Sequence, residues 1–395
     1  MQMRRRIFTF LVSLLLLCTL GVHADGAMAQ KVLKIGGVFE LSGTAAGMGF
    51  PESEGLKLAV AEINDQGGVD IAGEKHKIEL LLFDTRGNPS DAVGIAEKLI
   101  AREGVKLILS GADSATNMAM QEVTQSAKVL HLCVGCTGFL KVLGAPGKEY
   151  LFKASPFEGG EKGTAEHFLP YIVKASNIKT AVIMLPSSES GKMYAEVDEK
   201  FLKQAGVSVL DVVFYNPSLR DFYPQLSRIK LKNPDMLGVG FTDDGVIPIL
   251  RQAVEMGIKS KLVGLGAGMS EKAAYASGGD KPIEGYSWIA YFPPLGDPKV
   301  VEFCKRYEKL HRKQCRGDVG FGILMYETLH NVIWAMQKTR TTTDTLKLAT
   351  ALKGNRFADG IVTREYSDKG LVSSNYWVAE VKNGAVNWKY VPLNK

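Results

Sequence analysis

The chain of 395 residues carries 48 Lys and Arg against 42 Asp and Glu, a formal net charge of +6. Beyond residue 29 the basic residues form no block, and aromatic residues are not interleaved with them as a nucleic-acid stacking surface would require. The composition therefore argues against a nucleic-acid partner. The length predicts two hydrophobic cores.

The first 29 residues have the pattern of a secretory signal peptide. Three basic residues, 4–6, precede an apolar run from Ile7 to Val22, and Ala27-Met28-Ala29 offers an A-x-A cleavage site. The apolar run is about 16 residues long, shorter than the roughly 20 that a membrane-spanning helix needs. We therefore expect cleavage near Ala29 and a periplasmic protein starting at Gln30. The loss of three Arg and one Asp lowers its formal charge to +4.

A strand, a loop of small residues and a helix open the mature chain. The strand begins at Val32, the loop covers residues 42–47, and the helix has an apolar face made of Leu56, Ala59, Val60 and Ile63. The loop lies at the carboxyl end of its strand, where open α/β sheets bind ligands. Its glycines let backbone amides approach a polar or anionic group. We expect this loop to form one lip of a binding site.

Two more strand and helix units follow in the first half. An apolar strand at 80–83 leads through a turn to a helix capped by Ser90. The strand at 105–109 runs into the loop 110–116 and a helix from about Asn117. Short hydroxyl side chains and free amides at the start of a helix suit a carboxylate, although Asp113 or Ser114 would also serve as an ordinary helix cap.

The next strand, 129–132, ends in a C-x-x-C motif formed by Cys133 and Cys136. In an exported protein this motif could be a redox centre, half of a metal site or a local disulfide. Little helix signal follows it, unlike the pattern of thioredoxin-like sites, and the six histidines lack paired spacing for a metal. A structural disulfide or a buried thiol pair is favoured. Cys304 and Cys315 are the other expected pair.

The second half repeats the opening pattern. A strand at 180–185, a loop at 186–191 and an amphipathic helix form a second lip, and strands at 207–215 and before Gly240 follow. Residues 300–312 and 321–338 read as amphipathic helices that contribute to the core. The tail from Tyr376 is expected to form a hairpin with an Asn-Gly turn.

The segments 34–43 (KIGGVFELSG) and 55–69 (GLKLAVAEINDQGGV) resemble the opening of the solute-binding proteins of branched-chain-amino-acid-type ABC transporters. The similarity continues over nearly all of the mature chain and includes Leu250-Arg251-Gln252-Ala253. It implies an α/β fold of two doubly wound parallel-sheet lobes joined by a three-segment hinge, a type I periplasmic binding protein. The implied division places 30–152 and 288–372 in lobe 1, and 153–287 and 373–395 in lobe 2.

The resemblance also implies a ligand site in the cleft between the lobes. In this family the loop at Ser114 holds the carboxylate of the ligand, Thr137 matches a ligand-binding hydroxyl, and Phe241 sits where an aromatic residue flanks the ligand. We expect hydroxyls and helix-start amides to hold a carboxylate while aromatic residues bury the remainder. The predicted ligand contacts are Ser42, Met48, Ser114, Cys136, Thr137, Phe157, Ser190, Phe241, Thr242 and Tyr291.

Three positions depart from the amino-acid-binding members of the family. Those relatives carry an acidic residue where this chain has Gly266, and tyrosines where it has Met48 and Ser190. A buried ammonium must be paired, so the usual partner of an amino group is missing unless Asp243 replaces it. The ligand is therefore either an amino acid or a carboxylic acid or amide without the amine.

The function implied is periplasmic capture of a small solute and its delivery to the permease of an ABC importer. We expect no catalytic residues, cofactor or metal, since no G-x-S-x-G, H-E-x-x-H or P-loop motif is present. The protein is also expected to be a monomer. Two alternatives remain at this stage. The fold also serves ligand-sensing modules, and Cys133 with Cys136 could support thiol-disulfide exchange.

Overall fold

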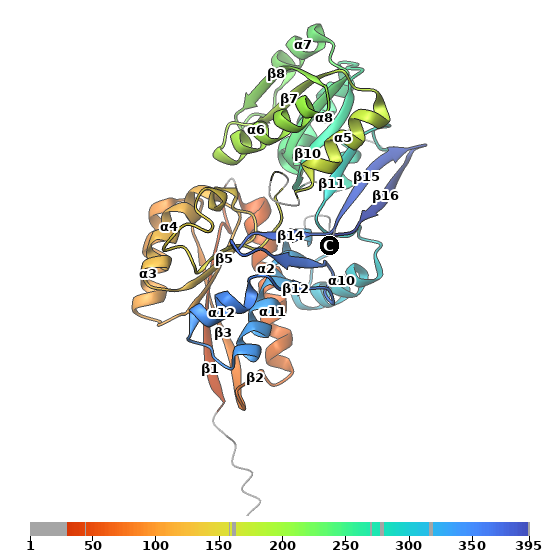
Figure 1. Cartoon of the computed structure of the whole chain (residues 1–395). Helices are drawn as coiled ribbons and strands as arrows, with labels where there is room; N and C mark the ends of the chain where they lie inside the picture. Colours follow the sequence, from red (N-terminus) through yellow and green to blue (C-terminus); the bar gives the residue numbers. More distant parts are fainter. Residues whose placement is uncertain are drawn as a thin grey trace, which may run out of the picture.

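The protein forms two α/β lobes, one above the other in Figure 1. The computed structural model describes residues 30–43, 45–157, 159, 163–268, 271–276, 280–315 and 319–393, without the side chains of 241–244, 267 and 268. The predicted fold class is confirmed. No helix in these ranges is long and apolar enough to cross a membrane.

The first lobe is built on a six-stranded sheet in the order β2-β3-β1-β4-β5-β6. All neighbours are parallel except β2 and β3, and Gly36 at the centre of β1 pairs with both Leu81 and Ile108. Because β1 connects to β3 on one side and lies beside β4 on the other, the strand order reverses at β1. The strands are β1 (Lys31–Phe39), β2 (Val69–Ile71), β3 (Glu74–Asp84), β4 (Leu107–Ser110), β5 (Leu130–Cys133) and β6 (Leu151–Lys153).

Helices cover both faces of this sheet. They are α2 (Ala46–Asp65), α3 (Pro89–Ala101), α4 (Ser114–Ser126), the 3-10 turn η1 (Thr137–Lys141), α10 (Pro298–His311), α11 (Val319–Thr339) and α12 (Thr345–Leu352). The core of one face comes from α2 and α10 to α12, and that of the other from α3 and α4. The predicted apolar face of α2 is buried there. Its Gly55 permits the close crossing of α11, because a Cβ would lie 1.9 Å from the Gly322 carbonyl oxygen.

The second lobe has a seven-stranded sheet in the order β16-β15-β11-β10-β9-β7-β8. Its strands are β7 (Thr180–Pro186), β8 (Ser208–Tyr215), β9 (Met236–Thr242), β10 (Lys261–Gly268), β11 (Ser287–Ala290), β15 (Tyr376–Lys382) and β16 (Ala385–Val391). Its helices are α5 (Ala165–Ser176), α6 (Glu189–Gln204), α7 (Tyr223–Lys232), α8 (Asp243–Glu255) and α9 (Glu271–Ala274). Helices α5 and α6 cover one face, and α7 to α9 cover the other.

Three connections join the lobes, but strand pairing shifts their positions from the predicted ones. Strand β11 pairs with β15, so residues 288–290 lie in the second sheet and not in the first lobe. Lys153 pairs with Cys133 and still belongs to the first sheet. On the last connection, the small sheet of β12 (Arg356–Phe357), β13 (Arg364–Tyr366) and β14 (Val372–Ser374) ends just before β15 begins. These strand ends lie one to three residues from the predicted boundaries, a difference comparable to the uncertainty of any element end.

The tail forms the expected hairpin. Lys382 pairs with Ala385 across a two-residue turn, and both turn residues, Asn383 and Gly384, have positive φ angles of 56° and 71°. Asn-Gly is the preferred sequence for this turn because both positions need the left-handed region. The hairpin adds the last two strands to the sheet of the second lobe.

Four of the five cysteines form two disulfides. Cys133 pairs with Cys136 at the end of β5, and Cys304 on α10 pairs with Cys315 eleven residues later. The second bond ties the segment after α10 back onto that helix, which packs against α2. It therefore constrains the chain at the margin of the first lobe.

We predict that the double change Cys304→Ser and Cys315→Ser lowers the free energy of unfolding by about 3 kcal/mol, the loop-closure value for a bridge of this span. Urea unfolding followed by circular dichroism would measure it. An unchanged midpoint with an unchanged slope would show that the bond adds no stability.

Candidate functional site

A cleft of about 650 Å³ lies between the lobes. On the first lobe it is lined by residues 43, 45–48, 112–114, 135, 137, 153, 155 and 156, together with Phe321 and Leu324 of α11. On the second lobe it is lined by residues 186, 188, 190, 194, 215, 217, 218, 220 and 245, with Tyr291 and Phe292 on the connection between the lobes. Nearly all of these segments follow the carboxyl ends of parallel strands.

The position of the cleft follows from the two sheets. In the first lobe, β1 leads into α2 on one face while the neighbouring β4 leads into α4 on the other. The loops therefore diverge and leave a crevice between them, as expected at a point where strand order reverses. In the second lobe, β7 leads into α6 on one face and the neighbouring β9 leads into α8 on the other. The cleft is where these two crevices meet.

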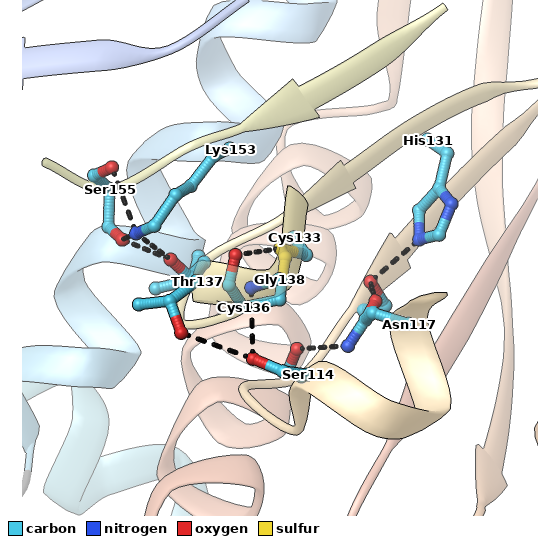
Figure 2. The surroundings of a disulfide bond; sticks show 12 residues. Ser114, Asn117, His131, Cys133, Cys136, Thr137, Gly138, Lys153 and Ser155 are labelled. Carbon is cyan, nitrogen blue, oxygen red and sulfur yellow. Dashed lines mark hydrogen bonds between the residues drawn. A yellow bond between two sulfur atoms is a disulfide. The ribbon is translucent and has the colours of Figure 1, made fainter. Parts of the chain in front are cut away.

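Three hydroxyl groups converge in the cleft. The Thr137 hydroxyl donates to Ser190 Oγ at 2.6 Å, and Ser114 Oγ shares hydrogen bonds with Ser190 Oγ at 3.1 Å and Thr137 Oγ1 at 3.3 Å. Ser114 Oγ also accepts from the Gly138 amide at 3.1 Å (Figure 2). Ser190 belongs to α6 of the second lobe, whereas Ser114 and Thr137 belong to the first. The lobes thus meet through groups that can equally bind an anion.

Two helix N-termini flank these hydroxyls. Helix α4 begins at Ser114 and is capped by Asp113, whose Oδ1 accepts from the Thr116 amide at 2.7 Å. Helix α6 begins at Glu189 and is capped by Ser188, which accepts from the Gly191 amide at 3.1 Å. The first amides of a helix have no partner within it, and the helix dipole favours negative charge there. Both helix starts therefore favour an anionic group in the cleft.

An ion pair beside the cleft also joins the lobes. Lys141, at the end of η1, pairs with Glu189 at the start of α6. Both side chains are exposed, so the pair adds little stability by itself. This ion pair and the hydroxyl contacts show that the two lobes touch each other beside the cleft.

Aromatic side chains form much of the remaining wall. Tyr194 lines the cleft and is supported by Phe157 behind it, with ring centroids 5.2 Å apart in an edge-to-face arrangement. The Tyr291 hydroxyl shares a 2.9 Å hydrogen bond with Thr164, and the Tyr215 hydroxyl donates to the Gly240 carbonyl at 2.6 Å. These hydroxyls are satisfied by the protein, so the rings present mainly apolar surface to a ligand.

The comparisons with known proteins agree with this geometry. A family model described as periplasmic binding protein matches residues 32–385. The chain belongs to the periplasmic binding protein family. A relative from Brucella abortus, Leu/Ile/Val-binding protein homolog 7, is 28% identical over 347 residues, which cover 83% of this chain and 82% of the relative. Family and fold are those of solute-binding proteins, which are not enzymes.

Two solved structures illustrate how widely this fold is used. A branched-chain amino acid transporter substrate-binding protein, LivJ from Streptococcus pneumoniae in complex with isoleucine, has a TM-score of 0.73 and 22% identity, covering 92% of this chain and all of that chain. A solute-binding protein of an ABC transporter from R. palustris in complex with benzoate also has a TM-score of 0.73, at 18% identity, covering 91% and 98%. These similarities establish the fold.

Five of the predicted contacts line the cleft of this periplasmic binding protein: Met48, Ser114, Thr137, Ser190 and Tyr291. Three others are not among its described lining residues. The Ser42 hydroxyl donates to Asp84 at 2.7 Å, Cys136 is buried in its disulfide, and Phe157 packs behind Tyr194. Phe241 and Thr242 end β9, and their side chains lie outside the described part.

Sequence reasoning missed three buried charged residues beneath the cleft: Glu40, Glu52 and Lys153. Glu52 gave a signal, because it stands four residues before Leu56 in the apolar stripe of α2, where a charged side chain is unexpected. Lys153 likewise interrupts an apolar strand. In the described part of the chain, no group of three or more His, Cys, Asp or Glu is placed to hold a metal.

Glu40 is held by hydroxyl and amide donors behind the loop of Ser114. Thr116 donates to its Oε1 at 3.0 Å, and the Asp113 amide lies 3.4 Å from its Oε2. Burial, together with the negative charge of Asp113, raises the pKa of Glu40 to about 7 despite these donors. Burial also raises the pKa of Glu52 well above its ordinary value.

Buried residues support the C-x-x-C loop. Both cysteines are fully buried, and His131 on β5 stands between Ser110 and Thr124, with its ring nitrogens 2.9 and 3.1 Å from their hydroxyl oxygens. Burial lowers the pKa of His131 to about 3, so this side chain is neutral and serves as a structural hydrogen-bonding group. A rigid support therefore underlies the loop that carries Thr137.

We predict that the raised pKa of Glu40 makes stability fall with rising pH. Between the ordinary carboxyl pKa and about 7 the folded state keeps a proton that the unfolded chain has lost, so the free energy of unfolding decreases over this interval. The shift corresponds to about 3 kcal/mol. Glu40→Gln should remove that contribution and flatten the profile between pH 5 and 8, measured by urea unfolding without ligand.

Glu97→Gln, on an exposed position of α3, is the matched control and should leave the profile as steep as in the wild type. A Glu40→Gln profile as steep as that of the control would contradict the assignment.

Proposed function

We propose that this protein is the periplasmic solute-binding component of an ABC importer. It captures a small carboxylate-bearing solute by closure of the two lobes and delivers it to the permease. Residues 1–29 act as a cleavable signal peptide, and the protein works as a monomer. The observation that carries the proposal is the convergence of Ser114, Thr137 and Ser190 at two helix starts from opposite lobes.

This convergence suits a carboxylate for two reasons. Three hydroxyls and the first-turn amides provide several donors for the two oxygens of the ligand, and hydrogen bonds to a charged group are stronger than neutral ones. The donors also come from both lobes, so a bound carboxylate links α4 and η1 to α6. Binding therefore stabilises the closed arrangement over the open one, which is the basis of capture.

The same cleft favours an acid without an amine. Gly266 offers no side chain where the amino-acid-binding relatives carry an acid, and Asp113, the one described carboxylate on the lining, is used to cap α4. Arg220 also lines the cleft and adds positive charge. Asp243 remains the alternative partner for an amine. The fold itself does not choose, because one structural neighbour holds isoleucine and another benzoate.

The two alternative functions have less support. Thiol-disulfide exchange needs a sulfur that a partner can reach, whereas both Cys133 and Cys136 are completely buried. A sensing module would bind its ligand in the same way, and delivery to a permease is what separates the two roles.

We predict that carboxylic acids stabilise the mature protein against heat. At a ligand concentration near 100 Kd the gain is about 2.7 kcal/mol, so the melting temperature should rise by about 5 °C. The panel would hold leucine, phenylalanine, benzoate, 4-hydroxybenzoate and short fatty acids, each beside its primary amide. We expect benzoate-type acids to stabilise and their amides to fail.

Stabilisation by α-amino acids alone would instead indicate that Asp243 or a carbonyl group pairs with the ammonium group of the ligand. Equal stabilisation by an acid and its amide would contradict carboxylate recognition.

We predict that Ser114→Ala weakens binding of the best acid of that panel by about tenfold to a hundredfold, because it removes a hydrogen bond to a charged group. Isothermal titration calorimetry would measure the change. Ser126→Ala is the matched control, since this exposed residue ends the same helix far from the cleft. Affinity equal to that of the control would remove Ser114 from the site.

A further inference from the structure

Two residues with ionisable side chains, Glu52 and Lys153, are buried at the base of the cleft, and the proposed ligand contacts do not account for them. Glu52 on α2 has no exposed surface, and Lys153 at the end of β6 is 2% exposed. Charged side chains are almost never buried to this extent unless they are paired. Their position below the loop of Thr137 raises the question of what they hold in place.

The Lys153 ammonium joins two segments that both matter for binding. Its Nζ donates to Ser155 Oγ at 2.7 Å, to the carbonyls of Ser155 and Pro156 at 3.2 Å each, and to the Val134 carbonyl at 3.4 Å. The Ser155 hydroxyl also donates to the Val134 carbonyl. Figure 2 shows Lys153 reaching Ser155 beside the Cys133–Cys136 loop. Val134 lies three residues before Thr137, whereas Ser155 and Pro156 begin the connection to the second lobe.

Glu52 lies against the same loop from the other side. Its Oε1 is 3.6 Å from the position that a Cβ on Gly135 would take, and its Oε2 is 3.2 Å from that position on Gly111. The two glycines thus leave room for the carboxylate behind the binding loops. Lys153 therefore binds Val134 of this loop, and Glu52 lies on the side of its neighbour Gly135 where a Cβ would stand.

Glu52 is a poor group for stability alone. Neither of its carboxylate oxygens has a hydrogen-bond partner in the part of the chain that the structure describes. An unsatisfied buried carboxyl is costly, and an apolar side chain would fill the same space without that cost. Burial raises the pKa of Glu52, whereas the positive charge of Lys153 opposes the rise.

We propose that Lys153 is a positioning residue for ligand binding, with Glu52 packed against the same loop from the other side. Its ammonium holds the loop of residues 134–138 against the connection at 155–156, so that the Thr137 hydroxyl and the Gly138 amide stay directed at Ser114. The inference rests on the proposed function of the cleft and adds a residue that acts through others.

The test is a double-mutant cycle of Lys153→Met, Glu52→Gln and the two changes together, with Lys148→Met as the control. Lys148 is another largely buried lysine of the first lobe, and it pairs with Glu122 at 2.9 Å. Replacing it by Met removes the same kind of side chain at a position outside the loop of residues 134–138. Each protein would be titrated with benzoate and with leucine, unfolded in urea, and examined by hydrogen exchange of segment 134–138 without ligand.

We expect Lys153→Met to weaken binding by at least about tenfold and to speed exchange in segment 134–138, because the loop loses several charge-assisted hydrogen bonds. The double variant should bind as weakly and exchange as fast as Lys153→Met, because the hydrogen bonds of the ammonium are missing in both. Lys148→Met should retain both properties.

Recovery of affinity together with stability in the double variant would overturn the proposal, because Lys153 would then serve only to neutralise Glu52. Should Lys153→Met fail to fold, the double variant supplies the same comparison. If the wild type binds neither benzoate nor leucine, the function proposed above fails for these acids. If hydrogen exchange in segment 134–138 is the same in Lys153→Met as in the wild type, the positioning role is overturned independently of the function.

Discussion

The structure depends on one constraint of parallel sheets: all of their loops that precede helices gather at the same edge. Helix starts carry amides without partners within the helix, and these amides need acceptors. Asp113 caps α4 and Ser188 caps α6, and each cap leaves further first-turn groups facing the cleft. Two such edges placed face to face produce a site with many donors and few acceptors. The anionic character of the expected ligand follows from the backbone before any side chain is considered.

Side chains then refine what the backbone supplies. The first lobe provides two of the three hydroxyls and the buried charges that support their loops, while the second provides Ser190 and much of the aromatic wall. The first lobe also holds its binding loop with a buried disulfide, a neutral His131 and the Lys153 ammonium. These supports make one half of the site rigid, which reduces the conformational entropy lost on binding.

Periodicity and glycine-rich loops predicted the fold well, because the alternation of apolar strands and amphipathic helices is a local property of the chain. Met48, Ser114, Thr137, Ser190 and Tyr291 lie on the cleft lining, and their role in binding stays a prediction. Ser42, Cys136 and Phe157 lie close to those same ends, yet each contacts another residue instead of lining the cleft: Asp84, Cys133 and Tyr194 respectively. Whether a side chain three or four residues past a strand end faces a cleft depends on tertiary contacts, such as that of Asp84 with Ser42. Glu52 and Lys153 were missed because only the fold brings residues about a hundred positions apart against one loop.

The unequal division of donors between the lobes has a consequence for the order of binding. A carboxylate can meet Ser114, Thr137 and the start of α4 on the first lobe alone, so an open form already presents most of the polar site. The second lobe adds Ser190, the start of α6 and the rings of Tyr194 and Tyr215, which enclose the part of the ligand beyond its carboxylate. In the proposed mechanism, affinity for the acid group is therefore set mainly by the first lobe, whereas the gain on closure depends on how well the remainder of the ligand fits the second. Selectivity among acids then resides in the closure step, and a change such as that at Gly266 can alter the preferred solute without disturbing the hydroxyls that hold the carboxylate.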